Sequence, residues 1–277
     1  ASAVHAENNS GGCRSALYDV RNHNHHAFDE LAADPAFAHP RSRCCILQQI
    51  FRQENFADVP PSVAQHVYPQ RPLVCSRADV ALVFIGGFGD EISGIIEHMA
   101  RRLPPLATKE ARAYYHWNAG VTEDATKGYQ VIANAVTAFR QQNPKADVVL
   151  IGHSMGAAAA VKAAELLPPR TPEQGRVFLI TLDPTDRVVQ PVRPHSVAWW
   201  GNAYVVNSQS GHDFIAELGG RWNHCKQADA NICFNGLRTD EFGYEFIHDN
   251  ALSLLMSCRG SVKSSLFKLL NYQLNNK

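Results

Sequence analysis

Residues 147–156, with the sequence DVVLIGHSMG, constrain the fold of this chain more than any other stretch. Residues 148–152 are apolar, small or β-branched, which predicts a buried central strand. A run of good helix formers, residues 157–167, follows directly. The stretch is therefore expected to form a strand, a sharp turn and a helix, with Ser154 at the turn.

The turn has the pattern G-x-S-x-G. Gly152 and Gly156 lack Cβ atoms, so helix and strand can approach closely while Ser154 is held in a strained conformation with its hydroxyl exposed. The helix N-terminus lies beneath Ser154, so the N–H of Met155 points at negative charge that develops there. The pattern predicts a nucleophilic serine. Because the bare pattern also recurs by chance, a serine in an ordinary strand–helix turn is the alternative.

The run LIGHSMGAAAAVKAAEL resembles the nucleophile elbow of the α/β-hydrolase superfamily, especially the lipase form GHSxG followed by small residues. The resemblance covers residues 80–255 in strand order and site motifs. It implies an α/β fold with a mostly parallel central sheet and helices on both faces. It also implies acyl transfer to water, a reaction for which we expect no metal and no organic cofactor.

A glycine-rich loop, GGFGD, follows the strand predicted at residues 80–85. In α/β-hydrolases the loop after this strand supplies the second oxyanion donor, and GGFGD resembles the HGF-type version with Gly86 in place of histidine. The resemblance implies an oxyanion hole formed by the N–H groups of Met155 and Phe88, with Gly87 as the next candidate. A phosphate-binding loop is the alternative, but the Walker lysine and the complete dinucleotide pattern are missing.

An acidic turn follows the strand predicted at residues 177–182. A carboxylate at the carboxyl edge of the strand next to the nucleophile strand can orient a histidine and stabilise its cation. LDPTD resembles the GLDPA acid motif of the pancreatic-lipase type, which favours Asp183. Asp186 is the reserve candidate, with an Asx-turn as the structural alternative for either residue. Asp213, beyond a strand predicted at residues 199–206, is the third candidate.

The candidate base is His248, immediately before a helix predicted at residues 251–256. It follows Ser154 and Asp183 in the chain, and this agrees with the order nucleophile, acid, histidine of the superfamily. His212, in SGHD, is the rival histidine.

Composition narrows the class of partner and the compartment. Lys plus Arg and Asp plus Glu each number 26, so the formal net charge is zero and no nucleic-acid partner is expected. No run of about 18 apolar residues predicts a membrane-spanning helix. Seven cysteines favour a secreted or periplasmic compartment, with seven buried thiols in a cytoplasmic protein as the alternative. Cys225 and Cys233 enclose a short polar loop and are the pair predicted to form a disulfide bond.

The domain organisation follows from these elements. Residues 1–77, which include the histidine-rich segment 22–26, are predicted to pack as a flank on a catalytic domain formed by residues 78–277. We interpret the histidines as a solvated loop, since metal-ligand spacing is missing. Residues 207–243 are predicted to be an excursion that forms a lid or acyl pocket, or alternatively a stapled surface loop.

These observations predict a serine ester hydrolase, most specifically a lipase or phospholipase acting on lipid acyl esters, with peripheral contact to a membrane. A small-ester carboxylesterase or an acyl thioesterase would use the same machinery. The alternative of a different class is a non-catalytic member of the fold that uses the pocket for binding or the N-terminal region for a protein partner.

Overall fold

The computed structural model describes residues 78–88, 90, 94–103, 105–117, 125–210 and 213–276. The predicted N-terminal flank, residues 1–77, lies outside these described residues together with its histidine-rich segment. Among the described residues, none of the helices combines the length and apolar character needed to cross a membrane.

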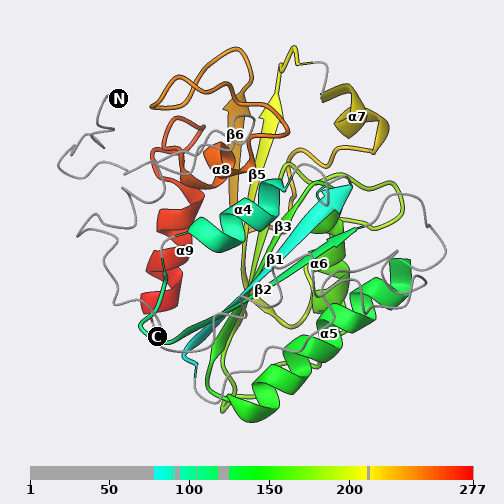
Figure 1. Ribbon diagram of the computed structural model, residues 1–277, viewed down its shortest axis with the longest axis vertical. Coiled ribbons are helices and arrows are strands. Elements are labelled where there is room, and N and C mark those ends of the chain that lie inside the picture. The colour runs from blue at the N-terminus through cyan, green and yellow to red at the C-terminus, as the bar shows by residue number, and fades with distance from the viewer. Residues whose placement is uncertain are drawn as a thin grey trace.

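The described residues contain one six-stranded sheet in which every neighbouring pair is parallel (Figure 1). The strand order is β2-β1-β3-β4-β5-β6. The strands are β1 (Val80–Phe88), β2 (Glu110–Trp117), β3 (Asp147–His153), β4 (Val177–Leu182), β5 (Val197–Val206) and β6 (Ala230–Asn235). Parallel strands are buried on both faces, which explains why β3 and β4 are mostly apolar and are buried at every residue. The predicted α/β fold class is confirmed.

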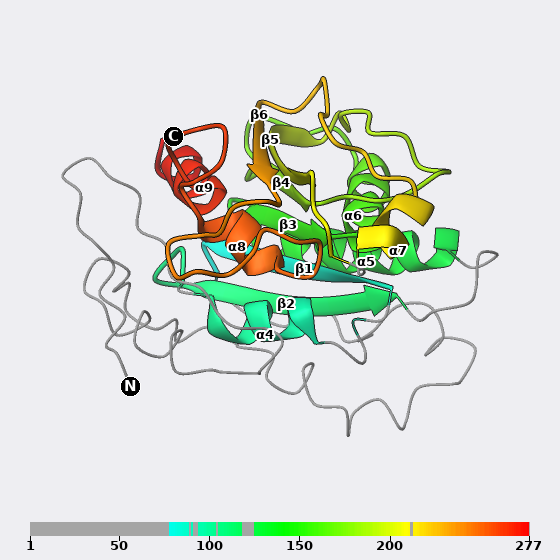
Figure 2. The same cartoon turned by 90° about the horizontal axis from the view of Figure 1, so that it is seen from above.

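Helices cover both faces of the sheet (Figure 2). One face packs against α4 (Ile95–Arg102), α8 (Ala251–Met256) and α9 (Leu266–Asn275). The other face packs against α5 (Ala125–Gln142) and α6 (Met155–Glu165). The small side chains of α6 are almost all buried, so this helix lies close against the strands beneath it. Because α6 begins at the carboxyl end of β3, its N-terminus lies at the sheet edge where parallel α/β proteins bind ligands.

Residues 207–243 are more regular than the sequence interpretation anticipated. The segment contains a short helix, α7 (Asp213–Leu218), and β6, the edge strand of the sheet. In β6 only Ile232 and Phe234 are buried, which is the alternation of a strand with one face on the core. Part of this excursion, β6, therefore belongs to the sheet.

The predicted disulfide bond between Cys225 and Cys233 is wrong, because both residues are free thiols. Burial raises the pKa of the Cys225 thiol to about 12. The loop between the two cysteines is closed by Asn231 instead. Its side-chain amide accepts a hydrogen bond from the N–H of Cys225 (3.0 Å) and donates one to the carbonyl oxygen of the same residue (2.9 Å).

An arginine clamp joins the C-terminal helix to the amino end of the nucleophile strand. Arg176, immediately before β4, forms an ion pair with Asp147 at the start of β3 (2.8 Å). The same guanidinium donates to the carbonyl oxygens of Gln273, Leu274 and Asn276 at 2.9–3.0 Å. The last turn of α9 therefore has its free carbonyl groups satisfied by a residue of the sheet.

Candidate active site

Ser154 lies in a sharp turn between β3 and α6, with φ 57° and ψ −130°. This conformation is strained for a residue with a side chain. The two glycines of the motif make the turn possible. A Cβ on Gly152 would lie 2.4 Å from the carbonyl oxygen of Gly156, and a Cβ on Gly156 would lie 2.3 Å from that of Ile85. Only glycine fits at either position, so the strand and the helix can meet beneath the serine.

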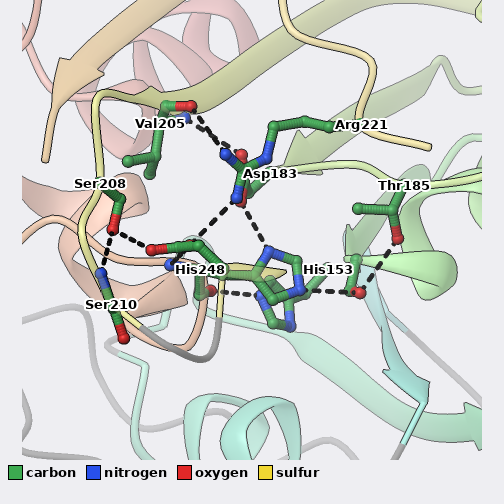
Figure 3. Close-up of polar contacts among 10 residues, drawn as sticks. His153, Asp183, Thr185, Val205, Ser208, Ser210, Arg221 and His248 are labelled. Carbon is green, nitrogen blue, oxygen red and sulfur yellow. Dashed lines mark hydrogen bonds and ion pairs between the residues drawn. The ribbon is translucent and has the colours of Figure 1, made fainter. Parts of the chain in front are cut away.

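Three predicted site residues form a continuous hydrogen-bonded chain (Figure 3). His248 Nε2 lies 2.9 Å from Ser154 Oγ, and His248 Nδ1 lies 2.6 Å from Asp183 Oδ2. All three side chains are buried, and Ser154, the most accessible of them, is 9% exposed. With a proton on Nδ1 donated to Asp183, Nε2 is left to accept the proton of the serine hydroxyl. This is the geometry of a nucleophile, a base and an acid that orients the base.

Asp183 is held as a carboxylate. Complete burial alone would raise its pKa, but the hydrogen bond and charge of His248, the charge of Arg221 and the N–H of Val205 outweigh burial and lower its pKa. The distance from Val205 N to Asp183 Oδ1 is 3.1 Å. Asp183 also has a positive φ of 42°, so both the nucleophile and the acid occupy unusual backbone conformations.

The carboxyl end of β1 passes directly beside the candidate nucleophile. The register between β1 and β2 shifts after Gly86, which makes Gly87 the extra residue of a β-bulge. A Cβ on Gly87 would lie 2.8 Å from Ser154 Cβ and 3.1 Å from the backbone nitrogen of Met155. Gly87 therefore adjoins both the nucleophile and the N-terminus of α6, and Phe88 follows it as the last residue of β1.

The reserve acids have other roles in the structure. Asp186 forms an Asx-turn, in which Oδ1 accepts the N–H groups of Val188 (2.5 Å) and Val189 (2.7 Å). Asp213 accepts the backbone N–H of His248 at 3.0 Å and does not contact its ring nitrogens. His212 lies outside the described residues. Within the part of the chain that the structure describes, no group of three or more His, Cys, Asp or Glu side chains is arranged to hold a metal ion.

Thr185 was not among the predicted site residues. Its hydroxyl oxygen lies 3.2 Å from Ser154 Oγ. Its backbone N–H also donates to the carbonyl oxygen of Ser154 at 3.2 Å. The turn that carries the acid therefore folds back over the nucleophile. The available signal was its position two residues after Asp183 in LDPTD.

His153 is a second histidine of the site that sequence analysis had not singled out. Its Nε2 lies 2.7 Å from the backbone carbonyl oxygen of His248, and the two rings are 4.8 Å apart. Burial, followed by the charge of His248, lowers the pKa of His153 to about 3. His153 is thus neutral at ordinary pH, and it donates a hydrogen bond that fixes the backbone of the candidate base.

Comparisons with known proteins locate the chain only broadly. No protein-family model matches it, and no curated protein matches it. Among solved structures, a candidate cell surface hydrolase from Lactobacillus plantarum WCFS1 aligns at 10% identity and a TM-score of 0.38, covering 65% of this chain and 91% of that one. A candidate hydrolase of the α/β superfamily from Xanthomonas campestris pv. campestris aligns at 16% identity and a TM-score of 0.32, covering 57% and 87%.

The architecture itself supplies the assignment of fold. The sheet is parallel, helices lie on both of its faces, and a G-x-S-x-G turn joins its central strand to a helix. The serine, the carboxylate and the histidine that meet at its carboxyl edge occur in the chain in the superfamily's order. The described residues therefore have the architecture of an α/β-hydrolase fold.

Proposed function

We propose that this protein is a serine hydrolase of carboxylic esters that acts on lipid acyl esters, as a lipase or phospholipase. The observation that carries the proposal is the hydrogen-bonded chain from Ser154 through His248 to Asp183, placed at the N-terminus of α6. Neutral His248 would accept the serine proton as Oγ attacks the ester carbonyl. The helix N-terminus and the bulge at Gly87 adjoin the position where the carbonyl oxygen becomes negative.

The proposed reaction has two halves. In the first, Ser154 forms an acyl-enzyme, and His248 returns the proton to the departing alcohol. In the second, His248 removes a proton from water, the hydroxide attacks the acyl carbonyl, and the proton returns to Ser154 as the carboxylic acid leaves. Asp183 holds the imidazolium in both halves, and the N–H groups of Met155 and of Gly87 or Phe88 receive the oxyanion.

Exposed apolar side chains near the site support a lipid ester over a small one. Met155, directly after the nucleophile, is 38% exposed, and Phe214 and Leu218 of α7 are 64% and 55% exposed. Val188, in the turn that follows the acid, is 87% exposed. A hydrogen bond from Arg187 Nε to the carbonyl oxygen of Leu218 holds this turn beside α7. The segments that present Val188, Phe214 and Leu218 also supply Asp183 and Asp213, so these exposed apolar groups belong to the segments that build the proposed site.

Hydrolysis of p-nitrophenyl esters from acetate to palmitate tests the substrate class. We expect kcat/KM to rise with chain length, and Ser154→Ala to abolish turnover of every ester. Activity confined to acetate and butyrate would contradict the lipid version and favour a small-ester carboxylesterase. A matched series of acyl thioesters distinguishes a thioesterase.

Labelling with a fluorophosphonate separates catalysis from mere binding. The wild-type protein should be labelled at Ser154, and Ser154→Ala should not be labelled at all. An unlabelled wild-type protein would support the non-catalytic alternative. Export to a secreted or periplasmic compartment and peripheral contact with a membrane stay predictions.

A further inference from the structure

A buried arginine lies between two carboxylates behind the candidate triad. Arg221 Nη2 is 3.2 Å from Asp183 Oδ2 and 3.0 Å from Asp213 Oδ1. The exposed fractions of the three side chains are 9%, 0% and 4%. Figure 3 shows Asp183 between Arg221 and the imidazole of His248. One guanidinium nitrogen therefore joins the candidate acid to a second carboxylate that the reaction scheme does not use.

The second carboxylate holds the candidate base through its backbone. Asp213 Oδ1 accepts the N–H of His248 at 3.0 Å, in addition to the bond from Arg221, and Asp213 Oδ2 accepts the hydroxyl of Ser208. The contacts form a closed ring. Asp183 binds the imidazole of His248, the backbone of His248 binds Asp213, Asp213 binds Arg221, and Arg221 returns to Asp183.

The backbone places Arg221 in this position. Residues Thr185 and Arg221 form a short antiparallel bridge, so the arginine lies beside the turn that carries Asp183. The N–H of Trp222 donates to the carbonyl oxygen of Pro184 at 2.9 Å and extends the same pairing. Arg221 Nε finds no hydrogen-bond partner among the described residues, whereas Nη1 donates to the carbonyl oxygen of Val205 (3.4 Å) and Nη2 is shared by the two carboxylates.

We propose that Arg221 and Asp213 are positioning residues for the reaction: together they fix Asp183 and His248 relative to each other, and Asp213 cancels the charge of Arg221. The inference rests on the proposed hydrolase function. A lone buried guanidinium beside Asp183 would offset much of the negative charge that stabilises the imidazolium. A second buried carboxylate beside it restores that charge. The ring thus fixes the positions of Asp183 and His248 without reducing the negative charge beside the imidazole.

Among the residues that the structure describes, few other charges face His248. From the end of β3 it meets the hydroxyl of Ser154 and the ring of His153, which is neutral at ordinary pH. Its own loop carries Glu245, which is exposed, and Asp249, which is half-buried. Within this described part of the chain, the ring and the backbone N–H of His248 contact Asp183 and Asp213, and Arg221 joins these two carboxylates.

Substitutions of Arg221 and of Asp213 should shift the pH profile of kcat/KM in opposite directions. Arg221→Gln removes a positive charge, which makes protonation of the imidazole easier, so the acid limb should move to higher pH by about half a unit or more. Asp213→Asn leaves the arginine uncancelled, so the acid limb should move to lower pH by a similar amount. In the double variant the midpoint should return close to the wild-type value, because both charges are gone.

A matched control separates charge from geometry. Arg221→Lys keeps the charge and loses the planar fork, so kcat should fall about tenfold or more while the midpoint stays at the wild-type value. Thermal unfolding of each variant identifies any that fail to fold. If Arg221→Gln does not fold, the other two variants still give different expectations: the midpoint should fall in Asp213→Asn and stay at the wild-type value in Arg221→Lys. Loss of kcat in every variant with one common midpoint would overturn the proposal and leave a merely structural ion pair.

A readout that needs no turnover keeps this inference distinct from the proposed function. The imidazole of His248 can be titrated by NMR in the wild type and in the same variants. Opposite displacements of the His248 titration midpoint in Arg221→Gln and Asp213→Asn would support the charge ring, which is the closed ring of Asp183, His248, Asp213 and Arg221, even if no ester were hydrolysed. If esters are hydrolysed and the titration midpoints coincide, the charge ring fails and the hydrolase proposal stands.

Discussion

The hydroxyl oxygen of Thr185 lies 3.2 Å from Oγ of Ser154, the same atom that His248 Nε2 contacts at 2.9 Å. A serine hydroxyl has one proton and two acceptor sites. If its proton points to the histidine, the threonine hydroxyl donates to a remaining acceptor site. Thr185 then holds Ser154 Oγ in the orientation needed for attack.

Replacing Thr185 with valine tests this contact. Thr185→Val keeps the shape and removes one hydrogen bond, so kcat should fall roughly 5- to 10-fold with KM nearly unchanged. Thr185→Ser retains the hydroxyl and should remain within about twofold of the wild type. Steady-state kinetics on a soluble ester provide the measurement. Equal losses in the two variants would contradict this role for the hydroxyl.

Substitutions in the proposed triad should cause the largest losses of activity. Ser154→Ala and His248→Ala should each lower kcat by about a millionfold, and Asp183→Asn by about ten-thousandfold, with the fold retained by circular dichroism. Ser196→Ala is a matched control, because Ser196 is a buried serine whose hydroxyl donates to the carbonyl oxygen of Ala164 at 2.6 Å. It should lose about 1 kcal/mol of stability and no activity. Substantial turnover by Ser154→Ala would refute the assignment of the nucleophile.

Gly87→Ala should lower activity far more than its loss of stability alone would explain. The new Cβ would lie 2.8 Å from Ser154 Cβ and 2.9 Å from the carbonyl oxygen of His153, so the elbow or the bulge must shift. We expect kcat to fall about a hundredfold or more, as when an oxyanion donor is lost. Gly243→Ala is the control, since Gly243 has φ +87° and open space around its Cα. It should cost about 1–2 kcal/mol of unfolding free energy and leave kcat unchanged.

The raised pKa of Asp90 predicts that the free energy of unfolding depends on pH. Burial raises its pKa from 3.8 to about 6, against hydrogen bonds from Ile96 and Tyr114 that lower it. Between these values the folded state binds more protons than the unfolded state, so stability falls as pH rises through about 4–6 and then levels off. Asp90→Asn cannot ionise and lacks this loss.

Urea denaturation of both proteins at pH 4 and pH 7 measures the effect. Relative to the wild type, Asp90→Asn should gain up to about 3 kcal/mol between the two pH values. The difference between the proteins isolates Asp90, because Asp240, whose pKa burial also raises to about 6, is present in both. The prediction would be contradicted if the difference in unfolding free energy between the wild type and Asp90→Asn were the same at pH 4 and pH 7.

The central strands could be predicted from sequence because burial on both faces requires apolar residues at nearly every position. The predicted strand at residues 177–182 coincides with β4, and the one at 148–152 lies within β3. The edge strand β6 was missed, since its sequence ANICFN contains two asparagines and has only one buried face. Helix α7 was missed because it has only six residues and is held by contacts of Asp213 that are distant in sequence.

The proposed reacting groups could also be located in the chain, because each follows a strand or precedes a helix at a recognisable place. Ser154, Asp183 and His248 are brought within hydrogen-bonding distance as their order predicted. The supporting residues could not be found this way. Thr185 and Arg221 act through a backbone bridge between segments 36 positions apart, and no local pattern encodes such a pairing.

The arginine clamp has a consequence for how the chain matures. Arg176 and Asp147 leave the ribosome about a hundred residues before the carbonyl groups of Gln273 and Leu274, and until then α9 cannot cover its face of the sheet. Parallel sheets form slowly because their contacts are distant in sequence. A nascent chain that carries all six strands thus still exposes apolar surface, and we expect chaperone dependence to end only when α9 emerges.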